Sequence, residues 1–111
     1  MPFLLVRARR ITRSSEYRRV YSGVKLVGRY ALLFYREAGA VDTRVGLTVS
    51  GKVGKACERN LFKRRLKEAL MVELDASDPR AELVFVATRR IREAGLDQIK
   101  KDLRALIARV K

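Results

Sequence analysis

The chain has 111 residues, 48% of them hydrophobic, and its 26 lysines and arginines outnumber its 12 acidic residues to give a formal net charge of +14. It contains no histidine and one cysteine, which excludes histidine-based catalysis, zinc fingers and an internal disulfide. The length predicts a single globular domain, and the positive charge predicts a polyanionic partner.

The charge is concentrated in the first part of the chain. Residues 1–67 carry 17 basic and 4 acidic side chains, a net of +13, whereas residues 68–111 carry 9 and 8, a net of +1. We therefore expect the polyanion site to lie in the first part. The apolar run at 3–6 is too short for a signal-peptide core or a membrane span, so we expect a cytoplasmic protein without a membrane partner.

The first thirteen residues (1–13) are predicted to form a basic arm without regular structure, ahead of a single folded domain (14–111). The arm either contacts phosphate or is a chain end without a role. The domain should begin with a short helix, because Ser14 or Ser15 can cap its first amides and Gly23 can end it. One face of this helix would carry Tyr17, Val20 and Tyr21.

Apolar alternation then predicts three strands, at 24–27, 29–36 and 44–50. The second is apolar on both faces, so one face can pack on the core while the other is offered to a ligand. Its two faces would carry Tyr30, Leu32 and Phe34 on one side and Ala31, Leu33 and Tyr35 on the other. A buried strand at 82–88, a basic connection at 89–95 and a helix at 96–110 are expected near the end of the chain.

A Gly/Lys loop and a basic helix, predicted over 56–75, occupy the middle of the chain. Residues 50–67 contain seven lysines or arginines and a single acid, Glu58. A merely solvated helix face should alternate its charges, and this one does not, so phosphate contact is the better interpretation. The core-facing stripe would be Phe62, Leu66, Ala69 and Leu70, and the outward arc Asn60, Lys63, Arg64 and Lys67.

Other functions have weaker support. We interpret Glu73, Asp75 and Asp78 as solvated carboxylates rather than a metal site, and Cys57 as a buried small residue rather than a reactive thiol. Ser50 has no base to activate it. An autonomous nuclease is therefore disfavoured, and the alternative is a ribosomal-type structural protein that binds RNA or DNA. The aromatic residues of the first helix and second strand could stack on bases or simply fill the core.

Three central motifs are Arg-Val-Gly-Leu-Thr-Val-Ser at 44–50, Lys-Val-Gly-Lys-Ala at 52–56, and Arg-Asn followed by Lys-Arg within 59–64. With Tyr-x-x-Val-Tyr at 17–21, they resemble the signature of the bacterial ribonuclease P protein subunit. The resemblance implies an α+β, two-layer sandwich with a four-stranded, mostly antiparallel sheet, helices packed on it, and a left-handed βαβ crossover of the ribosomal-protein type.

The resemblance also implies a non-catalytic subunit of the endoribonuclease that removes the 5′ leader of precursor tRNA. The catalytic RNA would carry the chemistry, with Mg²⁺ bound mainly by RNA and substrate and none by the protein alone, and one protein monomer would bind each RNA. Residues implied to face the catalytic RNA are Ser50, Lys52, Lys55, Arg59, Asn60, Lys63, Arg64 and Lys67. Residues implied to line a leader cleft between the first helix and the sheet are Tyr17, Tyr21 and Phe34.

The sequence departs from the family pattern in three places. Gly51 stands where a lysine is usual, and Leu61 stands where an arginine is usual. The spacing around Tyr21 is one residue short, which leaves the choice between Phe34 and Tyr35 in the following strand open.

Overall fold

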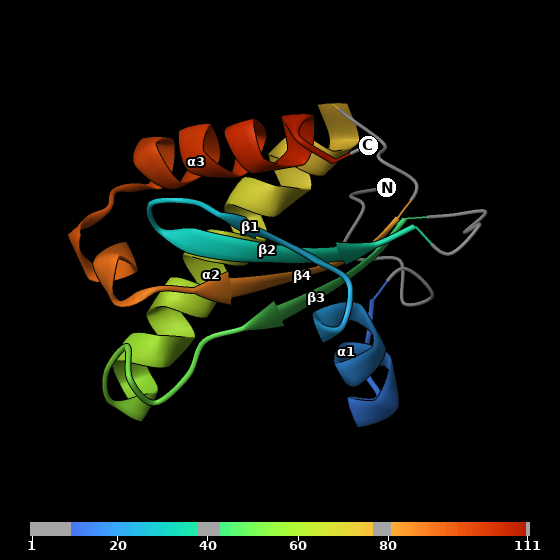
Figure 1. Ribbon diagram of the computed structural model, residues 1–111. Helices are drawn as coiled ribbons and strands as arrows, with labels where there is room; N and C mark the ends of the chain where they lie inside the picture. The colour runs from blue at the N-terminus through green and yellow to red at the C-terminus, as the bar shows by residue number, and fades with distance from the viewer. Residues whose placement is uncertain (1–9, 38–42, 77–80, 111) are drawn as a thin grey trace.

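The computed structural model describes residues 10–37, 43–76 and 81–110, which form one sheet with helices on both faces (Figure 1). The elements in chain order are α1 (Ser14–Tyr21), β1 (Val24–Val27), β2 (Ala31–Arg36), β3 (Arg44–Thr48), α2 (Ala56–Ala76), β4 (Glu82–Ala87), the 3-10 helix η3 (Arg89–Glu93) and α3 (Leu96–Ala108). The strand order is β1-β2-β4-β3. Two strand pairs are antiparallel and β3 pairs parallel to β4, so the predicted α+β, mostly antiparallel sheet is confirmed.

The two faces of the sheet are covered unequally. The main core lies between the sheet and the pair α2 and α3, where Leu33, Phe85, Leu66 and Leu103 are fully buried. On the other face α1 covers a smaller cluster formed by Ile11, Val20 and Val84, with Tyr17, Phe34 and Val86 packed against it. The second face is therefore only partly closed.

Phe34 and Tyr35 lie on opposite faces of β2. Tyr35 is 8% exposed within the main core, whereas Phe34 is half-buried on the α1 side. Phe34, and not Tyr35, is therefore the aromatic residue of β2 that shares a face with α1.

Some local predictions were wrong. The residue that precedes α1 is Arg13, without a side-chain cap, so neither serine caps this helix. The segment predicted to be an irregular arm forms a bridge between Arg10 and Val45, and the Ile11 amide donates a 2.9 Å hydrogen bond to the Val45 carbonyl. Ile11 is 4% exposed, because the apolar surface beneath α1 accommodates it. The rest of the predicted arm lies outside the described residues.

For two residues, the exposure to solvent is the opposite of what the local sequence predicted. Glu73 is 5% exposed and not solvated, since Arg104 donates two 3.0 Å hydrogen bonds to its carboxylate. Cys57 is exposed and not buried, because the core stripe of α2 turns another side of the helix toward the sheet. The side chain of Asp75 and the whole of Asp78 lie outside the described residues.

Asp102 of α3 fixes the turn between β1 and β2. Its carboxylate accepts hydrogen bonds from three successive backbone amides, at 2.9 Å from Arg29, 2.8 Å from Tyr30 and 3.2 Å from Ala31. A Cβ at Gly28 would lie 2.6 Å from the Ala31 carbonyl oxygen and 2.8 Å from an Asp102 oxygen, so only glycine fits there.

Candidate nucleic-acid interface

The predicted phosphate-binding residues lie in one stretch, on the loop after β3 and the first half of α2. We call this set the basic surface: Ser50, Lys52, Lys55, Arg59, Asn60, Lys63, Arg64 and Lys67. All are exposed except Arg59 and Lys67, which are half-buried. In the described part of the chain, none of the six cations in the set lies within ion-pair distance of a carboxylate. Uncompensated cations on one helix repel one another, and a polyanion relieves that repulsion.

The apolar side of α2, opposite the basic surface, explains why the cations remain exposed to solvent. Phe62, Leu66, Ala69 and Leu70 are all buried in the main core, as their spacing predicted. This anchored stripe fixes the rotation of the helix about its axis and thereby holds the outward arc at the surface. Gly51 and Leu61, two of the three departures from the family pattern, are both exposed beside the cations.

The three predicted leader-binding residues meet on the α1 face of the sheet. We call Tyr17, Tyr21 and Phe34 the aromatic cluster. The ring centroids of Tyr17 and Tyr21 are 6.3 Å apart, and those of Tyr21 and Phe34 are 4.9 Å apart in an edge-to-face arrangement. Tyr21 is 37% exposed, and the other two rings are half-buried. Such a cluster can present ring faces or edges to unstacked bases.

Tyr17 is held more tightly than Tyr21. A Cβ at position 46 would lie 2.7 Å from the Tyr17 ring, so Gly46 of β3 lets the ring approach the strand backbone. Burial raises the pKa of the Tyr17 hydroxyl, while a hydrogen bond with the Leu47 backbone acts in the opposite direction. The Tyr21 hydroxyl lies 3.3 Å from the Thr48 hydroxyl. Both tyrosines are therefore oriented by β3.

The sheet beside the aromatic cluster remains open. Leu32 and Val86 are paired across β2 and β4 and are only half-buried, as is Thr48 on β3. The ammonium group of Lys25 lies 5.9 Å from the Phe34 ring centroid, at cation–π distance. A strip with apolar ring surface and an adjacent cation suits single-stranded nucleic acid, which offers bases and phosphates together.

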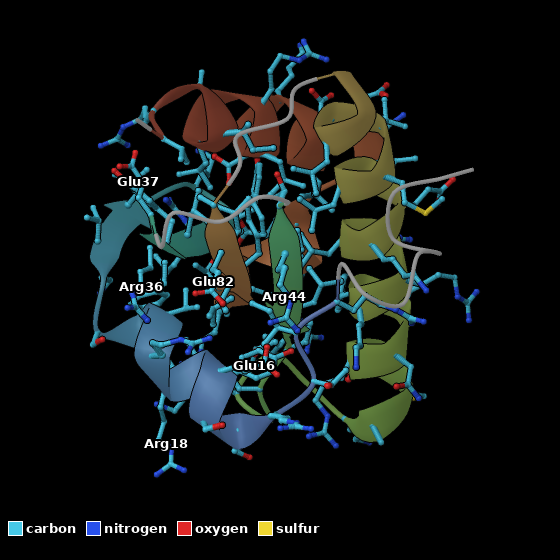
Figure 2. The ribbon with its side chains drawn as sticks, turned by 90° about the vertical axis from the view of Figure 1, so that its right-hand side faces the viewer. Glu16, Arg18, Arg36, Glu37, Arg44 and Glu82 are labelled. Atoms are coloured by element: carbon cyan, nitrogen blue, oxygen red, sulfur yellow. The ribbon has the colours of Figure 1, made fainter. Side chains whose placement is uncertain are left out.

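A charge network of Glu16, Arg19, Arg44 and Glu82 ties α1 to the sheet. Arg19 donates a 3.1 Å hydrogen bond to the Glu82 carboxylate, which is 4% exposed. Arg44 forms an ion pair with Glu16 and lies 4.0 Å from Glu82. Figure 2 shows Glu16, Arg44 and Glu82 gathered between α1 and the sheet, whereas Arg18 points away from them. The network holds the helix that supplies both tyrosines.

A pocket of 340 Å³ joins the two surfaces. Tyr17 of the aromatic cluster and Lys63 and Lys67 of the basic surface are among its lining residues. Arg10 also lines it, and the buried Nε of that side chain has no hydrogen-bond partner among the described residues. The remaining lining residues are Ile11, Thr12, Val45, Gly46 and Leu47.

The charge network and Lys25 were not predicted as part of the interface, whereas Arg10 belongs to the basic arm for which phosphate contact was one of two interpretations. Their partners are distant in sequence, as with Arg19 and Glu82, which are 63 positions apart. The density of arginine before residue 20 was the one signal available. No group of three or more potential metal ligands occurs among the residues that the structure describes. None of the described helices has the length and apolarity that a membrane span requires.

Comparison with known proteins supports the resemblance seen in the sequence. The ribonuclease P family profile matches residues 5–111. The ribonuclease P protein component of Clostridioides difficile is 31% identical over 105 residues, which cover 93% of this chain and 92% of that protein. The ribonuclease P protein component of Thermus oshimai is 46% identical over 90 residues, which cover 80% of this chain and 56% of that protein.

Solved structures agree in fold. The Staphylococcus aureus RNase P protein aligns with a TM-score of 0.79 and 26% identity, covering 94% of this chain and 98% of that chain. The RNase P protein from Thermotoga maritima aligns with a TM-score of 0.81 over 92% of this chain and 97% of that chain, and its 20% identity supports the fold alone.

Proposed function

This chain belongs to the ribonuclease P protein family and acts in tRNA processing as a protein component of ribonuclease P, and we propose that it binds the catalytic RNA and the precursor tRNA. The basic surface would contact phosphates of the catalytic RNA. The aromatic cluster and the open sheet beside it would hold the single-stranded 5′ leader.

One observation carries this proposal. Lys63 and Lys67 of the basic surface line the same pocket as the Tyr17 ring, and Tyr17 in turn neighbours Tyr21, so the proposed phosphate-binding surface adjoins the proposed base-stacking surface. A protein that only coated folded RNA would need the first surface but not the second. The pairing of the two supports a role in joining one RNA to the single-stranded part of another.

The chemistry is proposed to belong to the catalytic RNA. The Mg²⁺ ions would be bound mainly by that RNA and the substrate, with one protein monomer per RNA, in the cytoplasm. The cations of the protein would lower the repulsion between the two RNAs and so strengthen the binding of both precursor and magnesium. In this role the chain assists endonucleolytic removal of the leader without supplying a catalytic group.

Reconstitution with a bacterial catalytic RNA at low magnesium tests the proposal. We expect the chain to increase the rate of 5′-leader cleavage, and to make the complex bind precursor more tightly than mature tRNA. No gain in cleavage would exclude the role in leader removal. Equal affinity for precursor and mature tRNA would exclude the leader site and favour a structural RNA-binding protein.

A further inference from the structure

Residues 50–67 contain seven cations and one acid, Glu58. Both carboxylate oxygens of Glu58 have a partner within the protein. One oxygen, Oε1, accepts a 3.1 Å hydrogen bond from the backbone amide of Lys55, the residue before α2. The other oxygen, Oε2, lies 2.9 Å from Nη2 of Arg92 in η3. The first contact is half of a capping box, in which the third helical residue reaches back to the helix start.

Arg92 bridges two segments with one guanidinium group. Its Nη1 donates a 2.9 Å hydrogen bond to the carbonyl of Val53, while Nη2 contacts Glu58. The loop before α2 and the first turn of α2 are therefore held by the same planar group. A lysine has one ammonium nitrogen in place of the two guanidinium nitrogens that make these contacts, so it lacks the planar fork that matches them.

The loop has two further restraints. Val53 is 1% exposed in the main core, and its amide donates a 3.1 Å hydrogen bond to the Ser50 carbonyl. A Cβ at Gly54 would lie 2.9 Å from both Arg92 Nη1 and Glu58 Oε1, so the pair closes over the glycine. The loop is anchored at its centre, and Arg92 and Glu58 define how it enters the helix.

We propose that Glu58 and Arg92 are positioning residues for the basic surface. They hold the loop that carries Ser50, Lys52 and Lys55 in one arrangement before the catalytic RNA binds, so that less conformational freedom is lost on binding. Neither residue needs to touch RNA. This inference rests on the proposed function, since it assigns these residues to the surface that would meet the catalytic RNA.

Removal of the Glu58 carboxylate should change RNA affinity in opposite directions, depending on whether Glu58 acts through its charge alone or by positioning the loop. If charge alone mattered, removing a carboxylate from a phosphate-binding surface would tighten RNA binding. If Glu58 positions the loop, removing it weakens RNA binding. The side chains of Glu58 and Arg92 are 34% and 49% exposed, so their loss should change global stability little and the variants should fold.

The positioning role can be tested by measuring the affinity of the full chain for a bacterial ribonuclease P RNA at several salt concentrations. We expect Glu58→Gln and Arg92→Ala each to weaken binding by about three- to tenfold, and the double variant to be no worse than either. Arg92→Lys should behave like Arg92→Ala despite its charge. The matched control is Arg90→Ala in the same 3-10 turn, which removes an exposed cation and should cost less than about twofold.

Two results would overturn the proposal: unchanged or tighter RNA binding by Glu58→Gln, or an equal loss of RNA affinity in Arg90→Ala and Arg92→Ala.

Amide hydrogen exchange on the free protein provides a separate measurement. The Lys55 amide should exchange faster in Glu58→Gln and Arg92→Ala at an unchanged unfolding midpoint, and unchanged exchange would also overturn the proposal. If the wild-type chain fails to bind the RNA, the proposed function fails, while the exchange experiment still decides whether the pair orders the loop.

Discussion

The guanidinium of Arg104 in α3 donates two 3.0 Å hydrogen bonds to the carboxylate of Glu73 in α2. The Glu73 side chain is 6% exposed and that of Arg104 is 66% exposed, so a buried carboxylate is neutralised by a cation that reaches it from the surface. These hydrogen bonds raise the pKa of Arg104. The pair locks the two helices that cover the main core.

Truncation of Arg104 should therefore lower stability. In Arg104→Ala the buried carboxylate loses both donors, so we expect a lower thermal unfolding midpoint, measured by circular dichroism. Lys101→Ala is the control, because it removes an exposed cation from the same helix. Coincident melting curves for the two variants would show that the pair contributes nothing.

The charge network predicts a coupled effect on stability and leader binding. Glu82→Gln leaves Arg19 and Arg44 without their shared carboxylate, and we expect a loss of about 1–3 kcal/mol in unfolding free energy, because the partners are partly solvated. Since α1 carries both tyrosines, affinity for precursor should also fall. Glu37→Gln provides an exposed control with the same chemical change. An unchanged unfolding free energy in Glu82→Gln would contradict the role of the charge network in anchoring α1 to the sheet.

Asp102→Asn tests the tie between α3 and the β1–β2 turn. An amide cannot accept three backbone hydrogen bonds as a carboxylate does, and we expect a loss of about 1–3 kcal/mol in urea unfolding. Asp97→Asn makes the same change at an exposed site on the first turn of α3, where about 1 kcal/mol or less is expected. Similar losses in both would indicate that helix charge, not the turn, is responsible.

Two substitutions should separate the two RNA-binding surfaces. Tyr21→Ala removes the most exposed ring of the aromatic cluster, and we expect weaker binding of precursor by about 1–3 kcal/mol with mature tRNA unaffected. Arg64→Ala should instead weaken binding of the catalytic RNA and reduce the salt dependence by about one phosphate contact. Filter binding of each RNA measures both. Parallel losses in both assays would mean that a single surface is shared.

Leu61→Arg should restore a contact that the family pattern places there. Leu61 is 38% exposed beside the basic surface, so an arginine fits without repacking. We expect the affinity for the catalytic RNA to rise by about three- to tenfold at low salt, with a steeper salt dependence. Val72→Arg adds the same charge farther along α2, at a residue 49% exposed, and should have a smaller effect. Equal gains would show that only net charge matters.

Periodicity in the sequence was enough to predict the main helices and strands, most of the strand faces and the buried stripe of α2. The placement of Tyr30 on the face of Leu32 and Phe34 was wrong, because Tyr30 precedes β2 and is buried in the main core. It could not find contacts that depend on strand order. Glu82 lies beside Arg44 on β3 and beside Arg36 on β2 only because β4 is inserted between those strands. Glu73 was interpreted as solvated because its partner Arg104 is 31 positions away, on another helix.

The same insertion governs how the chain can assemble during synthesis. A ribosome synthesises β2, β3 and α2 before β4, the strand that joins both halves of the sheet. Until residue 87 has left the exit tunnel, the apolar stripe of α2 has no finished sheet to cover. The first 67 residues carry 17 of the 26 cations, so the nascent chain is a polycation that can bind nucleic acid non-specifically. Its basic surface becomes a defined binding site only after β4 has joined the sheet.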